Sequence, residues 1–140
     1  MKTQKTNLLQ QLIEKGKFDY ISFKITEKNF PLETIAETTP RLFYFGEPKT
    51  SSEVIKEMKK EGYRPANAYE LINYASNGWS NKELIIALGS VAEIAGSRHV
   101  LCLGRFDAER YLRLTWRGGD WLGVCRFLAF RIDENETTKL

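Results

Sequence analysis

Four short apolar runs, broken by glycine and polar residues, fill the C-terminal half of the chain. They are LIIALGSVAEI (84–94), HVLCLG (99–104), YLRLTW (111–116) and CRFLAFRI (125–132). Apolar runs of this length, bounded by turn residues, are typical of β-strands. The first and last runs do not alternate, which predicts strands buried on both faces. The chain is therefore expected to build a sheet mainly from its second half.

The run YLRLTW does alternate, and so predicts a strand with two different faces. Leu112, Leu114 and Trp116 are expected to point into the core. Arg113 and Thr115 are expected to point outward. This strand therefore combines a buried anchor side with a polar outer side.

Two segments before residue 62 predict helices. Residues 6–15 (TNLLQQLIEK) place leucine and isoleucine on one helical stripe, and Gly16 is expected to end that helix. Residues 50–61 begin with Thr50 and have Glu53 three positions later. This spacing is the capping-box pattern, in which each side chain bonds the other residue's backbone N–H group.

The same pattern predicts a third helix after residue 66. Asn67 caps the helix start and Glu70 reaches back to it, and residues 77–78 (Asn-Gly) end the helix. Its apolar side consists of Leu71, Ile72, Tyr74 and Ala75. Two or three helices packed on a mostly antiparallel, late-forming sheet make an α+β domain.

Two further strands are expected in the first half of the chain. Ile21, Phe23 and Ile25 alternate with polar residues, and RLFYFG (41–46) is a second apolar run. Between them, residues 29–40 (NFPLETIAETTP) are expected to connect the two strands, with room for one helical turn.

Length and composition predict one domain over residues 1–140. A chain of 140 residues with 42% hydrophobic content would bury roughly 70% of its unfolded surface on folding. It contains no run of the roughly 20 apolar residues that a membrane span needs. We therefore expect a soluble, cytoplasmic protein. Cys102 and Cys125 lie within apolar runs, which predicts two buried free thiols.

The basic residues are distributed unevenly. Ten of the twelve lysines lie before residue 61, whereas seven of the nine arginines lie within residues 98–131, a segment without lysine. The guanidinium group pairs with carboxylates and phosphates and stacks on aromatic rings, which makes arginine common at recognition surfaces. The C-terminal segment is therefore the candidate region for binding.

The sequence has few of the features that catalysis requires. His99 is the only histidine, and metal-ligand spacings, a Walker lysine and a GxGxxG loop are absent. We therefore expect a non-enzymatic protein with no catalytic residue, no metal site and no cofactor. A Cys102–Cys125 pair serving redox or copper chemistry remains an alternative.

A nucleic-acid-binding domain is a second alternative. The C-terminal arginines alternate with aromatic residues, a combination that can contact phosphates and stack on bases. Asp107, Glu109 and Asp120 offset part of this charge, and the sequence has no RNP, KH or helix-turn-helix signature.

A protein-binding or other ligand-binding surface is the third class. Trp116 and Trp121 flank the Arg-Gly-Gly-Asp sequence, which is typical of a turn. The segment is either an ordinary hairpin or a turn that also displays side chains. Tyrosine and arginine on the outer face of the strand favour display, because both are common interface anchors. We expect Trp116 to point inward, with residues 117–120 exposed for contact.

Two motifs resemble a known family. GYRPANAYEL (62–71) is similar to the G-x-R-L-P-T-x-x-E-W helix start of the formylglycine-generating enzyme branch of the C-type lectin-like fold. Gly62, Arg64 and Glu70 match in register, while Asn67 replaces the capping threonine and the proline comes one position early. RFLAFR (126–131) resembles the terminal G-F-R-L-V-R strand of that family. The catalytic cysteines of the enzymes have no counterpart here, so the resemblance implies binding.

The same branch includes the variable proteins of diversity-generating retroelements, whose short bacterial forms this chain resembles. The shared pattern is R-P-A-x-x-x-E-L, then A-L-G-S-V, then an aromatic-rich stretch ending in R-F-L-A-x-R. The resemblance implies a C-type lectin-like core over 50–131, and residues 1–49, which match none of these motifs, are expected to be an N-terminal extension of the fold. The polar end of the chain, 132–140, is expected to be a frayed tail. It also implies hypervariable ligand contacts at Tyr111, Arg113, Thr115, Arg117, Gly118, Gly119, Asp120, Leu122, Val124 and Cys125.

Overall fold

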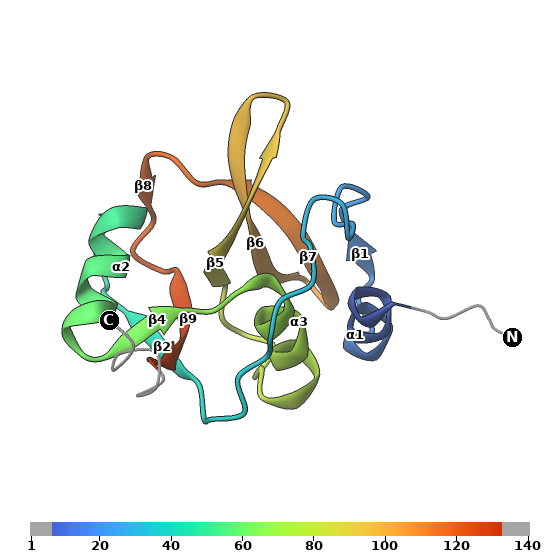
Figure 1. The fold of residues 1–140 in the computed structure, drawn as a ribbon, viewed down its shortest axis with the longest axis horizontal. Coiled ribbons are helices and arrows are strands. Elements are labelled where there is room, and N and C mark those ends of the chain that lie inside the picture. The colour runs from blue at the N-terminus through green and yellow to red at the C-terminus, as the bar shows by residue number, and fades with distance from the viewer. Residues whose placement is uncertain (1–6, 133–140) are drawn as a thin grey trace, which may run out of the picture.

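Three helices and nine strands occupy residues 7–132, the part of the chain described by a computed structural model (Figure 1). The helices are α1 (Leu8–Gly16), α2 (Ser51–Lys60) and α3 (Ala68–Asn77). The strands of the first half are β1 (Tyr20–Ile21), β2 (Arg41–Tyr44), β3 (Lys49–Thr50) and β4 (Tyr63–Pro65). Those of the second half are β5 (Ile85–Ile94), β6 (Ser97–Phe106), β7 (Glu109–Trp116), β8 (Asp120–Trp121) and β9 (Arg126–Arg131). The four predicted C-terminal strands are confirmed.

Seven strands form one mixed sheet in the order β1-β7-β6-β5-β9-β2, with β4 also paired to β9. Strands β5, β6 and β7 form an antiparallel meander. Strand β9 pairs antiparallel with β2 and β4 and parallel with β5, and the short β1 pairs parallel with β7. The expected α+β class, with three helices and a mostly antiparallel sheet from the C-terminal half, is confirmed.

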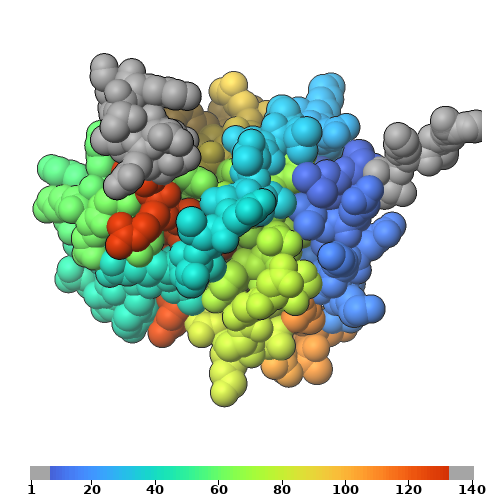
Figure 2. Space-filling view, turned by 60° about the horizontal axis from the view of Figure 1, so that its bottom comes forward, coloured from blue at the N-terminus to red at the C-terminus, as the bar shows by residue number. Residues whose placement is uncertain are grey.

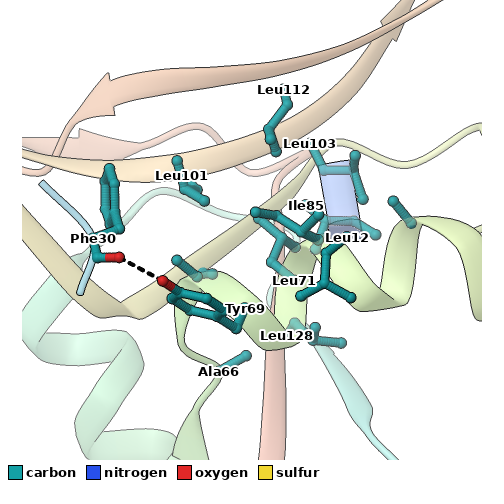
Figure 3. Close-up of a cluster of buried hydrophobic side chains, with 14 of the residues drawn as sticks. Leu12, Phe30, Ala66, Tyr69, Leu71, Ile85, Leu101, Leu103, Leu112 and Leu128 are labelled. Atoms are coloured by element: carbon teal, nitrogen blue, oxygen red, sulfur yellow. Dashed lines mark hydrogen bonds between the residues drawn. The ribbon is translucent and has the colours of Figure 1, made fainter. Parts of the chain in front are cut away.

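Helices cover both faces of the sheet (Figure 1). On one face α1 and α3 cover the α3 cluster, whose largest members include Leu12, Phe30, Tyr69, Leu71, Leu101, Leu112 and Leu128. Figure 3 shows these side chains converging, with the Tyr69 hydroxyl donating a 2.7 Å hydrogen bond to the Phe30 carbonyl. The opposite face carries the α2 cluster, which contains Phe43, Val54, Met58, Ile86, Cys102, Trp121, Cys125 and Phe127.

A buried ion pair joins β4 to α3. The Glu70 side chain is fully buried and accepts hydrogen bonds from both terminal nitrogens of Arg64, at 2.9 and 2.8 Å. Its two oxygens also accept from the backbone N–H groups of Asn67 (2.9 Å) and Ala36 (2.8 Å). Four donors therefore compensate the carboxylate for its loss of water, and they tie together β4, the start of α3 and the connecting segment.

The connecting segment runs over the surface beside α3 (Figure 2). The Asn67 side chain donates to the Thr34 carbonyl at 2.9 Å, and the Ala68 N–H group donates to the Ser90 hydroxyl at 2.7 Å. Residues 31–40 contain no helix, so the segment connects two strands as expected but without the helical turn.

The glycine of the ALGSV sequence permits a close backbone approach. The Gly89 N–H group donates to the Ala66 carbonyl at 2.7 Å. A Cβ atom at Gly89 would lie 2.5 Å from that carbonyl oxygen, closer than real Cβ contacts come. Glycine in a strand often marks such an approach, and here it brings β5 against the end of β4.

The predicted helix starts are confirmed at α2 and α3. Both capping boxes form, Thr50 with Glu53 and Asn67 with Glu70. The end of α1 differs from prediction, because Lys17 and not Gly16 takes the left-handed conformation, with φ 50°. Gly16 is required for packing instead, since a Cβ atom there would lie 2.3 Å from the Phe18 ring.

The predicted strand through Ile25 is wrong beyond Ile21. The chain turns at Ser22, whose hydroxyl accepts from the Lys24 N–H group at 3.4 Å and whose carbonyl accepts from Ile25 at 3.1 Å. Ile25 enters the α3 cluster, whereas Phe23 is 83% exposed. Local bonding of a serine side chain to the backbone competes with strand pairing, and alternation alone does not reveal it.

The described part of the chain begins at Asn7 and ends at Ile132. The Ile132 N–H group donates to the Gly62 carbonyl at 2.9 Å. The rest of the predicted tail, 133–140, lies outside the described residues. No helix within residues 7–132 is long and apolar enough to cross a bilayer.

Replacing Glu70 should destabilise the domain strongly. Glu70→Gln removes the charge facing Arg64 and places an NH2 group opposite two N–H donors, one from Arg64 and one from the backbone. The expected loss is about 3 kcal/mol or more in unfolding free energy. Urea unfolding measures the effect. Glu57→Gln is the matched control, because Glu57 forms an exposed pair with Lys60 at 3.3 Å and should cost less than about 1 kcal/mol. Equal losses in the two variants would contradict a structural role for the buried pair.

Candidate functional site

The predicted contact residues of β7 lie on the sheet face that α2 covers in part. Tyr111, Arg113 and Thr115 pair with Gly104, Cys102 and Val100 of β6, respectively. Arg113 is exposed, whereas Tyr111 and Thr115 are half-buried, and Tyr111 packs against the α2 cluster. The expected outward orientation therefore holds fully for Arg113 and in part for its two neighbours.

Two tyrosine rings hold the Arg113 side chain. The guanidinium carbon lies 4.1 Å from the centroid of the Tyr111 ring and 5.8 Å from that of the Tyr20 ring. Tyr20 and Tyr111 are register partners in the parallel pair of β1 and β7. A Cβ atom at Gly104 would lie 2.2 Å from the Tyr111 hydroxyl, so the glycine leaves space for the ring to lie across β6. We call these three residues, Tyr20, Tyr111 and Arg113, the tyrosine clamp.

Trp116 does not point inward as predicted. It is 59% exposed and belongs to neither buried cluster, whereas Leu112 is fully buried and Leu114 packs against the α3 cluster. The indole ring turns back over the glycines instead, because a Cβ atom at Gly118 would lie 2.4 Å from it and one at Gly119 would lie 3.3 Å away. Strand alternation correctly places Trp116 on the side of Leu112, but the α3 cluster ends before it.

Trp121 is the buried tryptophan of the pair. Strand β8 pairs with β3 and not with β7. Residues 116–121 therefore do not form a β-hairpin, which was one of the two interpretations of this segment. The Trp121 indole N–H group donates to the Ser51 hydroxyl at 2.9 Å, and that hydroxyl donates to the Arg117 carbonyl at 2.8 Å. The first residue of α2 thereby fixes both ends of the turn.

The remaining predicted contacts divide between surface and core. Gly118, Gly119 and Asp120 are exposed, and Arg117 is half-buried. Leu122 and Val124 are 70% and 60% exposed. Cys125 is buried in the α2 cluster, so its predicted role as a surface contact is incompatible with its position.

The two cysteines are free and buried, as predicted. Burial, together with the nearby Cys125 thiol, raises the pKa of Cys102 to about 12 against the opposing effect of Arg113. Burial likewise raises the pKa of Cys125 and of the Tyr111 hydroxyl. Because the thiolate is the reactive and metal-binding form, this environment disfavours thiol chemistry at neutral pH.

Arg110 has a structural role on the opposite face of β7. Its guanidinium group donates to the carbonyls of Gly16 (2.8 Å) and Ala75 (2.9 Å), in the last turns of α1 and α3. It also donates to the Asn81 side chain and lies 4.8 Å from the Trp79 ring centroid. Arginine at helix C-termini binds otherwise unpaired carbonyls and interacts favourably with the helix dipole.

Other arginines of the C-terminal segment also contact their own chain. Arg105 donates to the carbonyls of Asp107 at 2.8 Å and Asn81 at 3.3 Å. Arg126 stacks on Tyr44 at 4.4 Å. Three of the seven arginines between 98 and 131 therefore make contacts within the fold.

Groups for metal binding are not assembled in the described residues. Between residues 7 and 132, no three side chains of the histidine, cysteine or acidic type stand close enough to hold a metal ion. The Nδ1 atom of His99 lies 3.2 Å from the Ser97 carbonyl, within the β6 strand.

Sequence reasoning missed two surface residues. Tyr20 lies 91 positions before its partner Tyr111, and no local signal in the sequence connects them. Trp116 was expected in the core, although the adjoining Gly-Gly sequence could have indicated that a ring lies over the turn. The chain has no match among models of protein families, curated proteins or solved structures. Its function must therefore be inferred from these contacts.

Removing the Ser51 hydroxyl should loosen the turn. Ser51→Ala leaves the Trp121 N–H group and the Arg117 carbonyl without their partner, which should lower the unfolding free energy by about 1–3 kcal/mol. Urea unfolding followed by tryptophan fluorescence measures this change. Ser52→Ala is the control, because the neighbouring serine is exposed. A loss no larger than in the control would show that the bridge contributes nothing.

The buried Cys102 thiol should make stability fall at high pH. The unfolded thiol ionises near its ordinary pKa of 9.0, but the folded thiol only near about 12. Between these values the unfolded state releases a proton that the folded state retains, so stability is lost as pH rises. Urea unfolding at about pH 8 and about pH 10.5 should show a smaller fall for Cys102→Ala than for the unmodified chain. Identical falls would contradict this assignment.

Proposed function

We propose that this chain is a non-enzymatic recognition domain that binds a protein or another macromolecule through residues 111–125 and Tyr20. The observation that carries the proposal is the series of exposed apolar side chains along β7 and the segment after it. Trp116, Leu122 and Val124 are all exposed, and the exposed Tyr20 pairs with Tyr111 in the first half of β7. Large exposed apolar side chains gathered in one short segment, here Trp116, Leu122 and Val124, favour an interaction site.

The anchoring of this segment supports a display role. Trp121 and Cys125 are buried in the α2 cluster. The Ser51 hydroxyl holds the turn by hydrogen bonds to the Trp121 indole and the Arg117 carbonyl. Between these fixed points, side chains at Asp120, Leu122 and Val124 project into solvent. Substitutions at exposed positions usually change stability by less than about 0.5 kcal/mol. Such a surface can vary while the scaffold stays folded.

We further propose a C-type lectin-like fold and a relation to the variable proteins of diversity-generating retroelements. The residues that carry the resemblance support this proposal by their structural roles. Gly62 has φ +83° at the end of α2, and Arg64 and Glu70 form the buried ion pair. The proposal includes no catalytic residue, metal or cofactor. Its two free thiols are in keeping with a cytoplasmic location.

Nucleic-acid binding is less well supported. It needs a continuous row of cations that contact the phosphate backbone. Arg105 and Arg110 are engaged in contacts within the fold, and Asp107 and Glu109 lie beside them in the chain. A binding surface with few free cations and several exposed apolar groups fits a protein partner better.

Natural variation tests the diversified part of this proposal. Sequencing the 3′ end of the gene in many cells should show substitutions at codons of exposed residues, from Arg113 to Val124. The codons of Leu112, Trp121 and Cys125 should stay constant, because their side chains are buried. The flanking DNA should hold a near-identical template repeat and a reverse transcriptase gene. A uniform sequence without these neighbours would refute the retroelement relation.

A further inference from the structure

The guanidinium group of Arg113 is oriented but has no polar partner in the described structure. Its side chain is exposed, and no hydrogen bond or ion pair joins it to another residue between 7 and 132. Arg110 lies on the same strand and directs its donors to carbonyls and an amide. Of the two arginines, only Arg113 therefore retains its N–H donors for an external group.

The tyrosine clamp limits the freedom of these donors. Contact with an aromatic face engages the plane of the guanidinium group and leaves its in-plane N–H groups free. The 4.1 Å distance to the Tyr111 ring is typical of such stacking. Tyr111 is itself positioned by Gly104 and by packing against the α2 cluster. A ligand that binds Arg113 consequently meets a side chain that has already lost part of its conformational entropy.

We propose that Arg113 is the anchor for a carboxylate in an acidic and partly apolar segment of a partner protein. The inference rests on the proposed recognition function and names the chemistry of its ligand. The planar fork of arginine matches a carboxylate in a bidentate arrangement, which gives both orientation and affinity. Arg113 supplies the charged group of this site, and the rings of Tyr111 and of the exposed Tyr20 supply the apolar surface beside it.

The surroundings favour a protein segment over a nucleic acid. Within the described residues, the cation contacts to Tyr20 and Tyr111 both come from Arg113, whereas a phosphate backbone contacts a row of cations. The Tyr111 ring packs against the α2 cluster and is covered by Arg113, which leaves little of it for base stacking. A single guanidinium group beside two tyrosine rings complements one acidic residue with apolar neighbours.

Peptide selection tests this inference. The immobilised full chain is used to select binders from a random 12-residue peptide phage library. We expect the selected peptides to share an aspartate or glutamate with apolar residues beside it. A synthetic peptide of the most frequent sequence should bind Arg113→Lys about 10- to 100-fold more weakly than the unmodified chain. Lysine keeps the charge but loses the planar fork.

Controls separate the role of the clamp from general charge and folding effects. Arg98→Lys makes the same substitution at an exposed arginine outside the clamp, and should leave peptide affinity unchanged. Tyr20→Leu should weaken binding by a smaller factor than Arg113→Lys, because it removes one ring contact and keeps the guanidinium group. Thermal unfolding of each variant checks that the domain remains folded. Replacing the shared acid of the peptide by its amide should reproduce the loss seen in Arg113→Lys.

The possible outcomes distinguish the inference from the proposed function. Peptides without a shared acid that bind Arg113→Lys normally but lose affinity for Leu122→Ser would overturn the carboxylate anchor and keep the recognition surface. Failure to select peptides, or binders insensitive to both variants, would overturn both. A single-stranded oligonucleotide that binds the unmodified chain and not Arg113→Lys would replace the protein partner with a nucleic acid.

Discussion

The buried carboxylate of Glu70 is the constraint on which the arrangement of this fold depends most. It brings together β4, the first turn of α3 and the connecting segment through its bonds to Arg64, Asn67 and Ala36. A buried charge without such partners costs several kcal/mol, so these three pieces of chain must assemble together. The backbone contact of Gly89 with Ala66 then fixes β5 against the same corner. The contacts of Glu70 and Gly89 therefore position the antiparallel strands β5, β6 and β7 relative to the start of α3.

The second face of the sheet is organised by a different contact. Ser51 is the first residue of α2, and its hydroxyl joins the Trp121 indole to the Arg117 carbonyl. Helix α2 therefore both covers the sheet and holds the segment that follows β7. Because α2 covers only part of this face, the region around Tyr111 and Arg113 stays open. The same packing that stabilises the scaffold thus leaves this part of the sheet face open to solvent.

Local signals in the sequence predicted the helices and the long strands well. The capping boxes that begin at Thr50 and Asn67 depend on residues three positions apart, so the sequence contains all the information they need. The burial of the two tryptophans was not predicted correctly. Alternation predicts on which face of a strand a side chain lies, but not how far the packed helices extend over that face. Trp116 is exposed and Trp121 is buried for that reason. The position of Tyr20 depends on a parallel pairing across 91 residues, which no local pattern encodes.

Arg110 and Arg113 show why arginine content alone does not define a binding class. They lie three positions apart on β7, so the two side chains leave the sheet on opposite faces. Arg110 meets helix C-termini, where carbonyls without intrahelical partners accept its donors. Arg113 meets two tyrosine rings, which orient the guanidinium group without using its N–H groups. A guanidinium group in the first setting stabilises the fold, whereas one in the second can bind an external acid. The surroundings of each arginine therefore decide whether its N–H groups are used within the fold, as at Arg110, or left open to solvent, as at Arg113.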